Sequence, residues 1–357
     1  FMPSIEGGGV EKNLFIVANY LVDKLKYLSV ITASKKYKLK FNKNINLILP
    51  KFNFWEKTTR RIKYFVCFFL LILEIKKKGE IIVFCFQANI YCIILCKLFN
   101  TRILVRSNSS PSGWSKNFVK KLIYKNILNL ADKIMVNSLE FKKQLKNQFY
   151  LKSKCIYNPL NINEIRKLSK VRISEKFFSG TCLKIINVGR FADQKDHLTL
   201  LKAINLLKDK IKIKLMIVGG GQNEKKIRNY IKLNNLSKII KIKNFTENPF
   251  PLIQKADLFV LSSLYEGLPN VLLESLALKK FIISSDCPTG PSEILDNNKG
   301  GLLFQVSNYK DLANKILFFK SNKKKCIKKL KYACKRLDRF DYNKNLNKYY
   351  NLLLSIM

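Results

Sequence analysis

The chain has 357 residues, enough for two domains of typical size, each with its own core. A hydrophobic share of 47% and an aromatic share of 12% exclude a disordered chain. The net charge of +43 permits nucleic-acid binding, attachment to an anionic membrane, or a compositional bias towards lysine. The lysines are spread over the whole sequence and no nucleic-acid-binding motif accompanies them, which favours the last two interpretations.

The nine cysteines are irregularly spaced, and with the single histidine, His197, they form no zinc-binding pattern. We interpret them as buried, reduced thiols of a cytosolic protein. No signal peptide is visible, and the longest apolar run, residues 64–73, is shorter than the roughly 20 residues that span a bilayer. The sequence therefore predicts a protein that can lie on a membrane but does not cross one.

The first residues, Phe1-Met2, are typical of the end of a buried strand, and the glycines of residues 7–9 follow them. We expect a first strand that begins before residue 1 and a helix that starts near Val10. Glycines let the backbone approach a ligand, although a flexible turn is the alternative interpretation.

Strand-like apolar runs then alternate with helix-length segments, which predicts a parallel, doubly wound sheet. The expected strands cover residues 28–32, 47–49, 81–86, 102–105, 133–136 and 154–157. Polar segments follow two of these strands, Gln87–Asn89 and Arg106–Pro111, and open sheets place ligand loops at such positions. We expect ligand contacts there.

Two of the expected helices are basic and amphipathic, Arg60–Leu73 and Phe118–Leu128. Lysine and arginine beside large apolar side chains suit the headgroup region of an anionic bilayer. The alternative for each is an ordinary helix that packs its apolar face on the sheet. The first carries more apolar surface than one face needs, so we expect membrane contact there.

Asn158-Pro159 indicates a turn at the end of the first domain, and a polar linker with a short helix follows it. In the second domain, the strand at residues 185–188 leads to Gly189-Arg190 and then to Lys195. Asp196 is suited to cap the next helix, which makes His197 a first-turn helix residue rather than a catalytic base. A diphosphate near Arg190 and Lys195 would gain charge pairing and backbone donors.

Further along, the strand at residues 215–218 runs into a glycine turn that starts at Gly219, a weak signal because the full dinucleotide fingerprint is absent. Residues 240–250 supply another strand and a loop. The last part of the chain is rich in lysine and helical.

The most informative stretch begins at the apolar run Leu258–Leu261, which is typical of a strand buried on both faces. Glu266 lies in the following loop, a helix is expected from Asn270 to Leu278, and Glu274 lies about a turn and a half inside it. The amides of Gly267 and Leu268 are then free to meet an anion. Two acids around a helix start suit a phosphorylated, hydroxyl-rich ligand, whereas for a single pair ordinary exposed acids are the alternative.

These segments together resemble glycosyltransferase family 4, the retaining glycosyltransferases with an E-x7-E signature. The resemblance consists of four motifs in order: Val188-Gly-Arg190 with Gln194-Lys195-Asp196-His197, then Ile217-Val-Gly-Gly-Gly221, then Glu266 to Glu274, then Cys287-Pro-Thr-Gly-Pro-Ser-Glu-Ile-Leu295. The last resembles members that build bacterial surface polysaccharides. The likeness is strong from Leu183 to Phe304 and looser before that.

The resemblance implies the α/β GT-B architecture, in which two Rossmann-like doubly wound domains face a central cleft. We expect an acceptor-side domain over residues 1–165, in which Gln87–Asn89 and Arg106–Pro111 would contact the acceptor. A nucleotide-sugar-binding domain is expected over residues 166–340. A C-terminal helix over residues 341–357 is expected to pack back on the first domain.

The resemblance also implies transfer of a sugar from a nucleotide-diphosphate donor, UDP in our expectation, to a lipid-linked or polysaccharide acceptor with retention at the anomeric carbon. Glu266, Arg190 and Lys195 would be the catalytic residues, with the cations replacing a metal. We expect no metal and no cofactor, because the nucleotide sugar is a co-substrate. The remaining expected nucleotide-sugar contacts are Gly8, Gly9, Gly189, Gly219, Phe245, Gly267, Leu268, Pro269 and Glu274.

Two departures from the family pattern concern the donor's identity and the rate. Many members carry an N-domain histidine near the anomeric carbon, whereas this chain has none there, and Ser292 stands where related loops often have arginine. The alternatives are a nucleotide-sugar epimerase, a soluble disaccharide synthase, or a basic nucleic-acid-binding protein. We expect a cytoplasmic location at the inner face of the cell membrane and no specific nucleic-acid partner.

Overall fold

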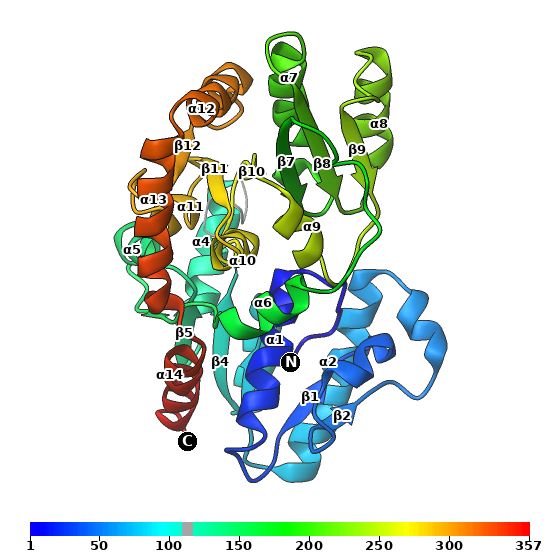
Figure 1. Ribbon diagram of the computed structural model, residues 1–357. Helices are drawn as coiled ribbons and strands as arrows, with labels where there is room; N and C mark the ends of the chain where they lie inside the picture. The colour runs from blue at the N-terminus through cyan, green and yellow to red at the C-terminus, as the bar shows by residue number, and fades with distance from the viewer. Residues whose placement is uncertain (109–116) are drawn as a thin grey trace. The chain divides into compact units, whose positions relative to one another are not determined.

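The computed structural model describes residues 1–108 and 117–357, and the chain forms two compact units. Unit 1 comprises Phe1–Pro159 and Tyr342–Met357, and unit 2 comprises Leu160–Asp341. Both units are built from parallel strands with helices packed on them (Figure 1). The expected boundary after residue 165 falls inside helix α6 (Ile162–Ser169), which packs against helices of unit 2.

Unit 1 contains two parallel sheets that residues 1–3 connect. The pair β1-β2 (Ser29–Ile31, Asn46–Ile48) stands beside the order β3-β4-β5-β6 (Ile82–Cys85, Arg102–Ser107, Lys133–Val136, Lys154–Cys155). The amide of Met2 donates to Ile31 O at 3.1 Å, and the amide of Phe86 donates to Phe1 O at 3.0 Å. Phe1-Met2 therefore has the strand-like position that its apolar character predicts.

The helices of unit 1 build two cores. Helix α1 (Gly9–Leu21) buries Leu14, Val17 and Leu21 at helical spacing and shares its core with α14 (Tyr342–Leu354). The other core lies under α2 (Arg60–Lys78), α3 (Asn89–Leu98), α4 (Phe118–Asn129) and α5 (Leu139–Phe149). Two short 3-10 helices, η1 (Lys35–Lys40) and η2 (Asn53–Lys57), complete the unit. None of the described helices has the length and apolar character that a bilayer crossing requires.

Unit 2 contains one parallel six-stranded sheet in the order β12-β11-β10-β7-β8-β9. The strands are β7 (Leu183–Val188), β8 (Ile213–Val218), β9 (Ile240–Lys243), β10 (Leu258–Leu261), β11 (Phe281–Ser285) and β12 (Leu302–Phe304). This order is that of the Rossmann fold, in which the chain reverses its direction of winding between the first and fourth strands. The reversal here lies between β7 and β10.

Helices complete the core of unit 2 because the sheet's apolar runs need cover on both faces. Leu258–Leu261 of β10 is buried along its whole length, as its unbroken apolar sequence predicts. The covering helices are α7 (His197–Leu207), α8 (Glu224–Leu233), α9 (Phe250–Lys255), α10 (Asn270–Ala277), α11 (Pro291–Ile294), α12 (Tyr309–Ser321) and α13 (Lys323–Lys335), with the 3-10 helices η4 (Asp193–Lys195) and η5 (Arg336–Phe340).

Candidate functional site

The candidate site lies in unit 2 at the reversal point of the sheet. Strands β7 and β10 are parallel neighbours, with Leu258 paired to Ile185. Their carboxyl ends therefore lie at the same edge, and open α/β sheets bind ligands at this position. The segment after β7 carries Lys195, and the segment after β10 carries Glu266.

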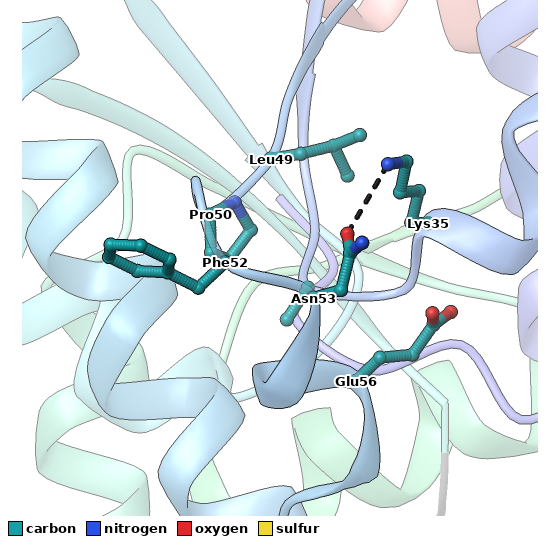
Figure 2. Close-up of a pocket in the computed structure, with 7 residues that line it drawn as sticks. Lys35, Leu49, Pro50, Phe52, Asn53 and Glu56 are labelled. Carbon is teal, nitrogen blue, oxygen red and sulfur yellow. Dashed lines mark hydrogen bonds between the residues drawn. The ribbon is translucent and has the colours of Figure 1, made fainter.

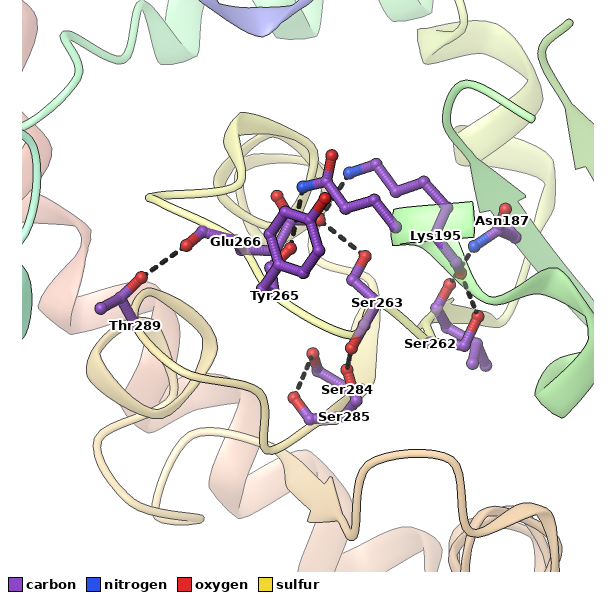
Figure 3. Close-up of polar contacts among 11 residues, drawn as sticks. Asn187, Lys195, Ser262, Ser263, Tyr265, Glu266, Ser284, Ser285 and Thr289 are labelled. Atoms are coloured by element: carbon purple, nitrogen blue, oxygen red, sulfur yellow. Dashed lines mark hydrogen bonds and ion pairs between the residues drawn. The ribbon is translucent and has the colours of Figure 1, made fainter. Parts of the chain in front are cut away.

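Lys195 and Glu266 form an ion pair at this edge. The Lys195 Nζ lies 2.5 Å from the Glu266 Oε1, and the two side chains are 16% and 8% exposed. The hydroxyl of Ser263 donates to the same oxygen at 2.6 Å (Figure 3). The site therefore combines a cation, a carboxylate and a hydroxyl, which suit the charges and hydroxyls of a phosphorylated sugar ligand.

The two segments are tied to each other by bonds from side chains to backbone. The hydroxyl of Ser262 donates to Lys195 O at 2.9 Å, and the Gln194 Nε2 donates to Tyr265 O at 2.8 Å. The amide of Leu264 also donates to Gln194 O at 2.8 Å. These bonds fix the backbones that carry Lys195 and Glu266, so the pair has a defined position.

Glycines allow the backbone segments that directly follow β7 and β8, called here the exits of these strands, to approach each other closely. A Cβ at Gly219 would lie 1.9 Å from the carbonyl oxygen of Gly189, a distance that real atoms do not adopt. Gly219 is therefore required for backbone contact between two strand exits.

Helix α10 begins beside the ion pair. Pro269 is its N-cap residue, so Gly267 and Leu268 immediately precede its first turn, as the sequence predicts.

The loop before α11 contacts the residues that precede α10. The hydroxyl of Thr289 donates to Glu266 O at 2.5 Å. Gly290, at φ +85°, packs so closely that a Cβ there would lie 2.3 Å from Gly267 O. The amides and dipole at this helix start favour an anion, and Glu274 is buried inside the helix with 7% exposure.

The other predicted residues have less enclosed positions. Arg190 follows Gly189 in the segment after β7 and is exposed to solvent. Phe245 follows β9 and is 56% exposed. Gly8 and Gly9 belong to unit 1, where Gly8 is the N-cap residue of α1 and Gly9 its first residue. The structure thus brings together Lys195, Glu266 and the start of α10.

Two titratable groups beside the cluster remain neutral. Burial, with Lys195 nearby, lowers the pKa of His197 to about 4, and its ring packs edge-on against Phe191 with centroids 5.2 Å apart. His197 begins α7 under the N-cap Asp196, so the prediction of a first-turn residue is confirmed. Burial and Glu266 raise the pKa of Cys287 to about 12, which excludes a reactive thiolate there.

Sequence reasoning missed Ser263, Gln194 and Thr289 as parts of this cluster. Ser263 is the second residue after a buried strand, a position that indicates a ligand loop. Gln194 and Thr289 lay within motifs already singled out, but their backbone bonds depend on segments far apart in the sequence.

The polar segments predicted as acceptor contacts in unit 1 are bonded to one another. The Asn89 Nδ2 donates to Arg106 O at 2.9 Å, and the Asn108 Nδ2 donates to Phe86 O at 2.8 Å. Arg106 is only 1% exposed, and its Nη2 donates to Asn158 Oδ1 at 2.7 Å, so it supports these segments from inside. Ser109, Ser110 and Pro111 lie outside the described residues.

A separate pocket in unit 1 lies beyond the carboxyl ends of β1 and β2. Its lining includes Lys35, Phe52, Asn53 and Glu56, and the Lys35 Nζ donates to Asn53 Oδ1 at 3.2 Å (Figure 2). None of the predicted site residues lines it. Among residues 1–108 and 117–357, no group of three or more histidine, cysteine or acidic side chains is arranged to hold a metal ion.

Comparison with protein families matches residues 172–336 to "Glycosyl transferases group 1", which confirms the resemblance predicted from the four motifs. An uncharacterised glycosyltransferase of Methanocaldococcus jannaschii is 32% identical over 218 residues, 57% of this chain and 53% of the relative. A 4-alpha-N-acetylgalactosaminyltransferase of Campylobacter jejuni, named for a diphospho-undecaprenol-linked glycan, is 29% identical over 230 residues, 61% of this chain and 60% of the relative. The chain thus spans little more than half the length of these two relatives.

A second Campylobacter jejuni relative, an alpha-1,4-N-acetyl-D-galactosaminyltransferase that acts on a PP-undecaprenol-linked glycan, is 25% identical over 94% of this chain and 92% of its own length. Among solved structures, Anabaena HepE in complex with UDP has a TM-score of 0.78 at 17% identity and covers 99% of this chain and 98% of its own. Sucrose-phosphate synthase from Thermosynechococcus elongatus has a TM-score of 0.80 at 17% identity, covering 100% and 99%. These likenesses confirm the predicted fold class, two α/β units with parallel sheets.

Proposed function

We propose that this chain, whose residues 172–336 match the group 1 glycosyltransferases, transfers a sugar from a UDP-sugar to a glycan or lipid-linked acceptor. The observation that carries the proposal is the Lys195–Glu266–Ser263 cluster at the reversal point of the unit 2 sheet, beside the start of α10. The similarity to a protein solved with UDP and to relatives named for glycan transfer supports it.

In this proposal the leaving diphosphate binds Lys195, Arg190 and the amides at the start of α10. Two cations and a helix N-terminus stabilise the charge that develops as the glycosidic bond to the nucleotide breaks. Glu266, held by the Ser263 hydroxyl, accepts hydrogen bonds from the donor sugar's hydroxyls, and Glu274 accepts hydrogen bonds from the ribose hydroxyls. We propose that this arrangement works without a metal or cofactor.

Retention at the anomeric carbon is part of the proposal. Among the described residues, the side-chain bonds of Glu266 lead to Lys195 and Ser263, and neither of these is a second carboxylate that could act as a nucleophile. We propose that a phosphate oxygen of the leaving group takes the acceptor's proton as the acceptor oxygen attacks from the same face. We further propose that the reaction occurs at the inner face of the cell membrane, and the relatives named for undecaprenol-linked glycans support this.

Nucleotide binding tests the site directly. Lys195→Ala and Glu274→Ala should each weaken UDP affinity by about tenfold or more, since each removes a charge-assisted hydrogen bond. The matched control is Lys238→Ala, because Lys238 precedes β9 and so lies at the opposite edge of the sheet. Titration calorimetry with UDP measures all three, and unchanged affinity in both site variants would refute the assignment.

Product analysis tests the acceptor class. The chain is incubated with a radiolabelled UDP-sugar and an undecaprenyl-diphosphate-linked glycan, and label is expected in the organic phase as lipid-linked product. Label that appears instead in a free disaccharide, or in an epimerised nucleotide sugar, would assign one of the alternative activities.

A further inference from the structure

We infer that unit 1 carries a docking surface for an anionic lipid membrane, formed by the outer faces of α2, α3 and α4. The surface, called here the outer face, consists of the residues that these three helices turn away from the sheet. Its vesicle-binding test requires no sugar transfer and is therefore independent of the proposed activity.

Helix α2 has two apolar faces. Cys67, Leu71 and Ile75 are buried against the sheet. On another side of the helix a second stripe recurs every three or four residues and stays in solvent: Ile62, Phe65, Phe69 and Leu73, which are 42%, 76%, 58% and 47% exposed. A surface helix needs one apolar stripe to pack on its core, so the second has no partner within the described part of unit 1.

Helices α3 and α4 repeat the arrangement. In α3, Cys92, Ile93 and Cys96 are buried, whereas Tyr91, Ile94 and Leu98 are 63%, 41% and 79% exposed. In α4, Val119, Leu122 and Ile123 are 62%, 44% and 49% exposed.

The exposed stripes lie on the same side of the sheet. The buried residues of α2, α3 and α4 belong to a single core cluster, so all three helices cover one face of it. The rings of Phe68 and Tyr91 are in edge contact with centroids 6.3 Å apart, which places α2 next to α3. Ten large apolar side chains on adjacent helices exceed the scattered exposure that ordinary surfaces show.

The positive charges of the outer face indicate what kind of partner binds it. Helix α2 begins with Arg60, Arg61 and Lys63, and α4 carries Lys120, Lys121 and Lys125, whereas the three helices together contain one acid, Glu74. A second copy of the chain would bring like charges together over this face. An anionic bilayer supplies negative headgroups for the lysines and hydrocarbon for the aromatic rings.

The neighbouring helix α5 shows where the surface ends. It covers the same core with Phe141, Leu145 and Phe149, but its outer side is mainly polar, with Glu140, Lys142, Lys143 and Lys146. The apolar character is thus confined to the three helices rather than shared by every helix of the layer.

Sedimentation with vesicles tests the inference. The chain should sediment with vesicles of phosphatidylcholine and phosphatidylglycerol and far less with phosphatidylcholine alone. The double variant Phe65→Ser/Phe69→Ser should lower the partition coefficient by about tenfold or more, because two apolar side chains no longer enter the bilayer. Lys120→Gln/Lys121→Gln should weaken binding and reduce its dependence on salt.

The matched control is Leu233→Ser, which removes an apolar side chain that is 82% exposed in unit 2 and should leave vesicle binding unchanged. Resistance to limited proteolysis, measured without vesicles, verifies that both units of each variant are folded. Equal partition of the double variant and the unsubstituted chain would overturn the inference. So would a dimer in solution that the double variant converts to a monomer without any vesicle binding, since the outer face would then be an interface between copies.

Discussion

His197, the single histidine of the chain, is held neutral by its surroundings rather than by a hydrogen bond. It is 3% exposed, packs on Phe191, and its Nε2 has no hydrogen-bond partner among the described residues. A protonated imidazole would be costly in this place because it would lose its hydration beside the Lys195 ammonium. This residue therefore links the pH of the solution to the stability of unit 2.

We predict that stability falls as the pH drops from about 6.5 towards 4, because the unfolded chain takes up a proton at this position that the folded chain, with a pKa of about 4, does not. The contribution is on the order of 3 kcal/mol when complete. His197→Phe keeps a ring against Phe191 and should make the pH dependence shallower in this window. Urea unfolding at several pH values measures the difference, and parallel curves for both proteins would contradict it.

The individual residues of the site were predictable from sequence only in part. Lys195, Glu266 and the helix start at Asn270 were found because the motif residues keep their order and spacing. Ser263 was not found, because its role depends on a bond to Glu266 that is visible only when the loop is folded. The exposure of Arg190 to solvent could not be predicted from the sequence either, because it depends on which segments pack around its loop.

At the scale of elements, buried strands were the most predictable features. Residues 133–136 and 258–261 form β5 and β10 as expected, because the apolar runs 134–136 and 258–261 suit strands covered on both faces. Strand ends were less predictable: β4 extends to Ser107, whereas the expected strand ended at residue 105. The order of the strands was not fixed by any local pattern, and that order is what brings the segments after β7 and β10 together.

The contact between the exits of β7 and β8 yields an element-scale prediction. Gly219→Ala should destabilise the chain by about 2 kcal/mol or more and weaken UDP binding, because the new Cβ would overlap the Gly189 carbonyl and displace that exit. Gly220→Ala is the matched control, since nothing lies within 4 Å of a Cβ there. Denaturant midpoints and UDP titrations measure both. Equal midpoints for the two variants would show that the exits can separate freely.

At the scale of the whole molecule, each unit has its own core, but unit 1 is assembled from both ends of the chain. Helix α14 contributes Leu346, Tyr349, Leu352 and Leu353 to the core that α1 also lines. The last residues of the sequence are therefore structural parts of the first unit.

We predict that a chain ending at Asp341 loses the fold of unit 1 and keeps that of unit 2. Removal of four buried side chains costs roughly 2–5 kcal/mol each, which exceeds the stability of a typical domain. Limited proteolysis should digest unit 1 and leave a protected fragment that contains residues 160–341, and this fragment should still bind UDP. Leu354→Ser, at a position 43% exposed on the same helix, is the control and should leave unit 1 protected.

The bond between Lys195 and Glu266 bears on how a turnover ends. One ammonium cannot pair fully with a carboxylate and a diphosphate at the same time. A ligand that forms an ion pair with Lys195 therefore leaves Glu266 without its cation. Under the proposed function an intact donor compensates for this loss, because its sugar hydroxyls donate hydrogen bonds to the Glu266 carboxylate. The nucleotide that remains after transfer has no sugar to donate these bonds. Glu266 then competes with this nucleotide for Lys195, and the competition would speed release of the product.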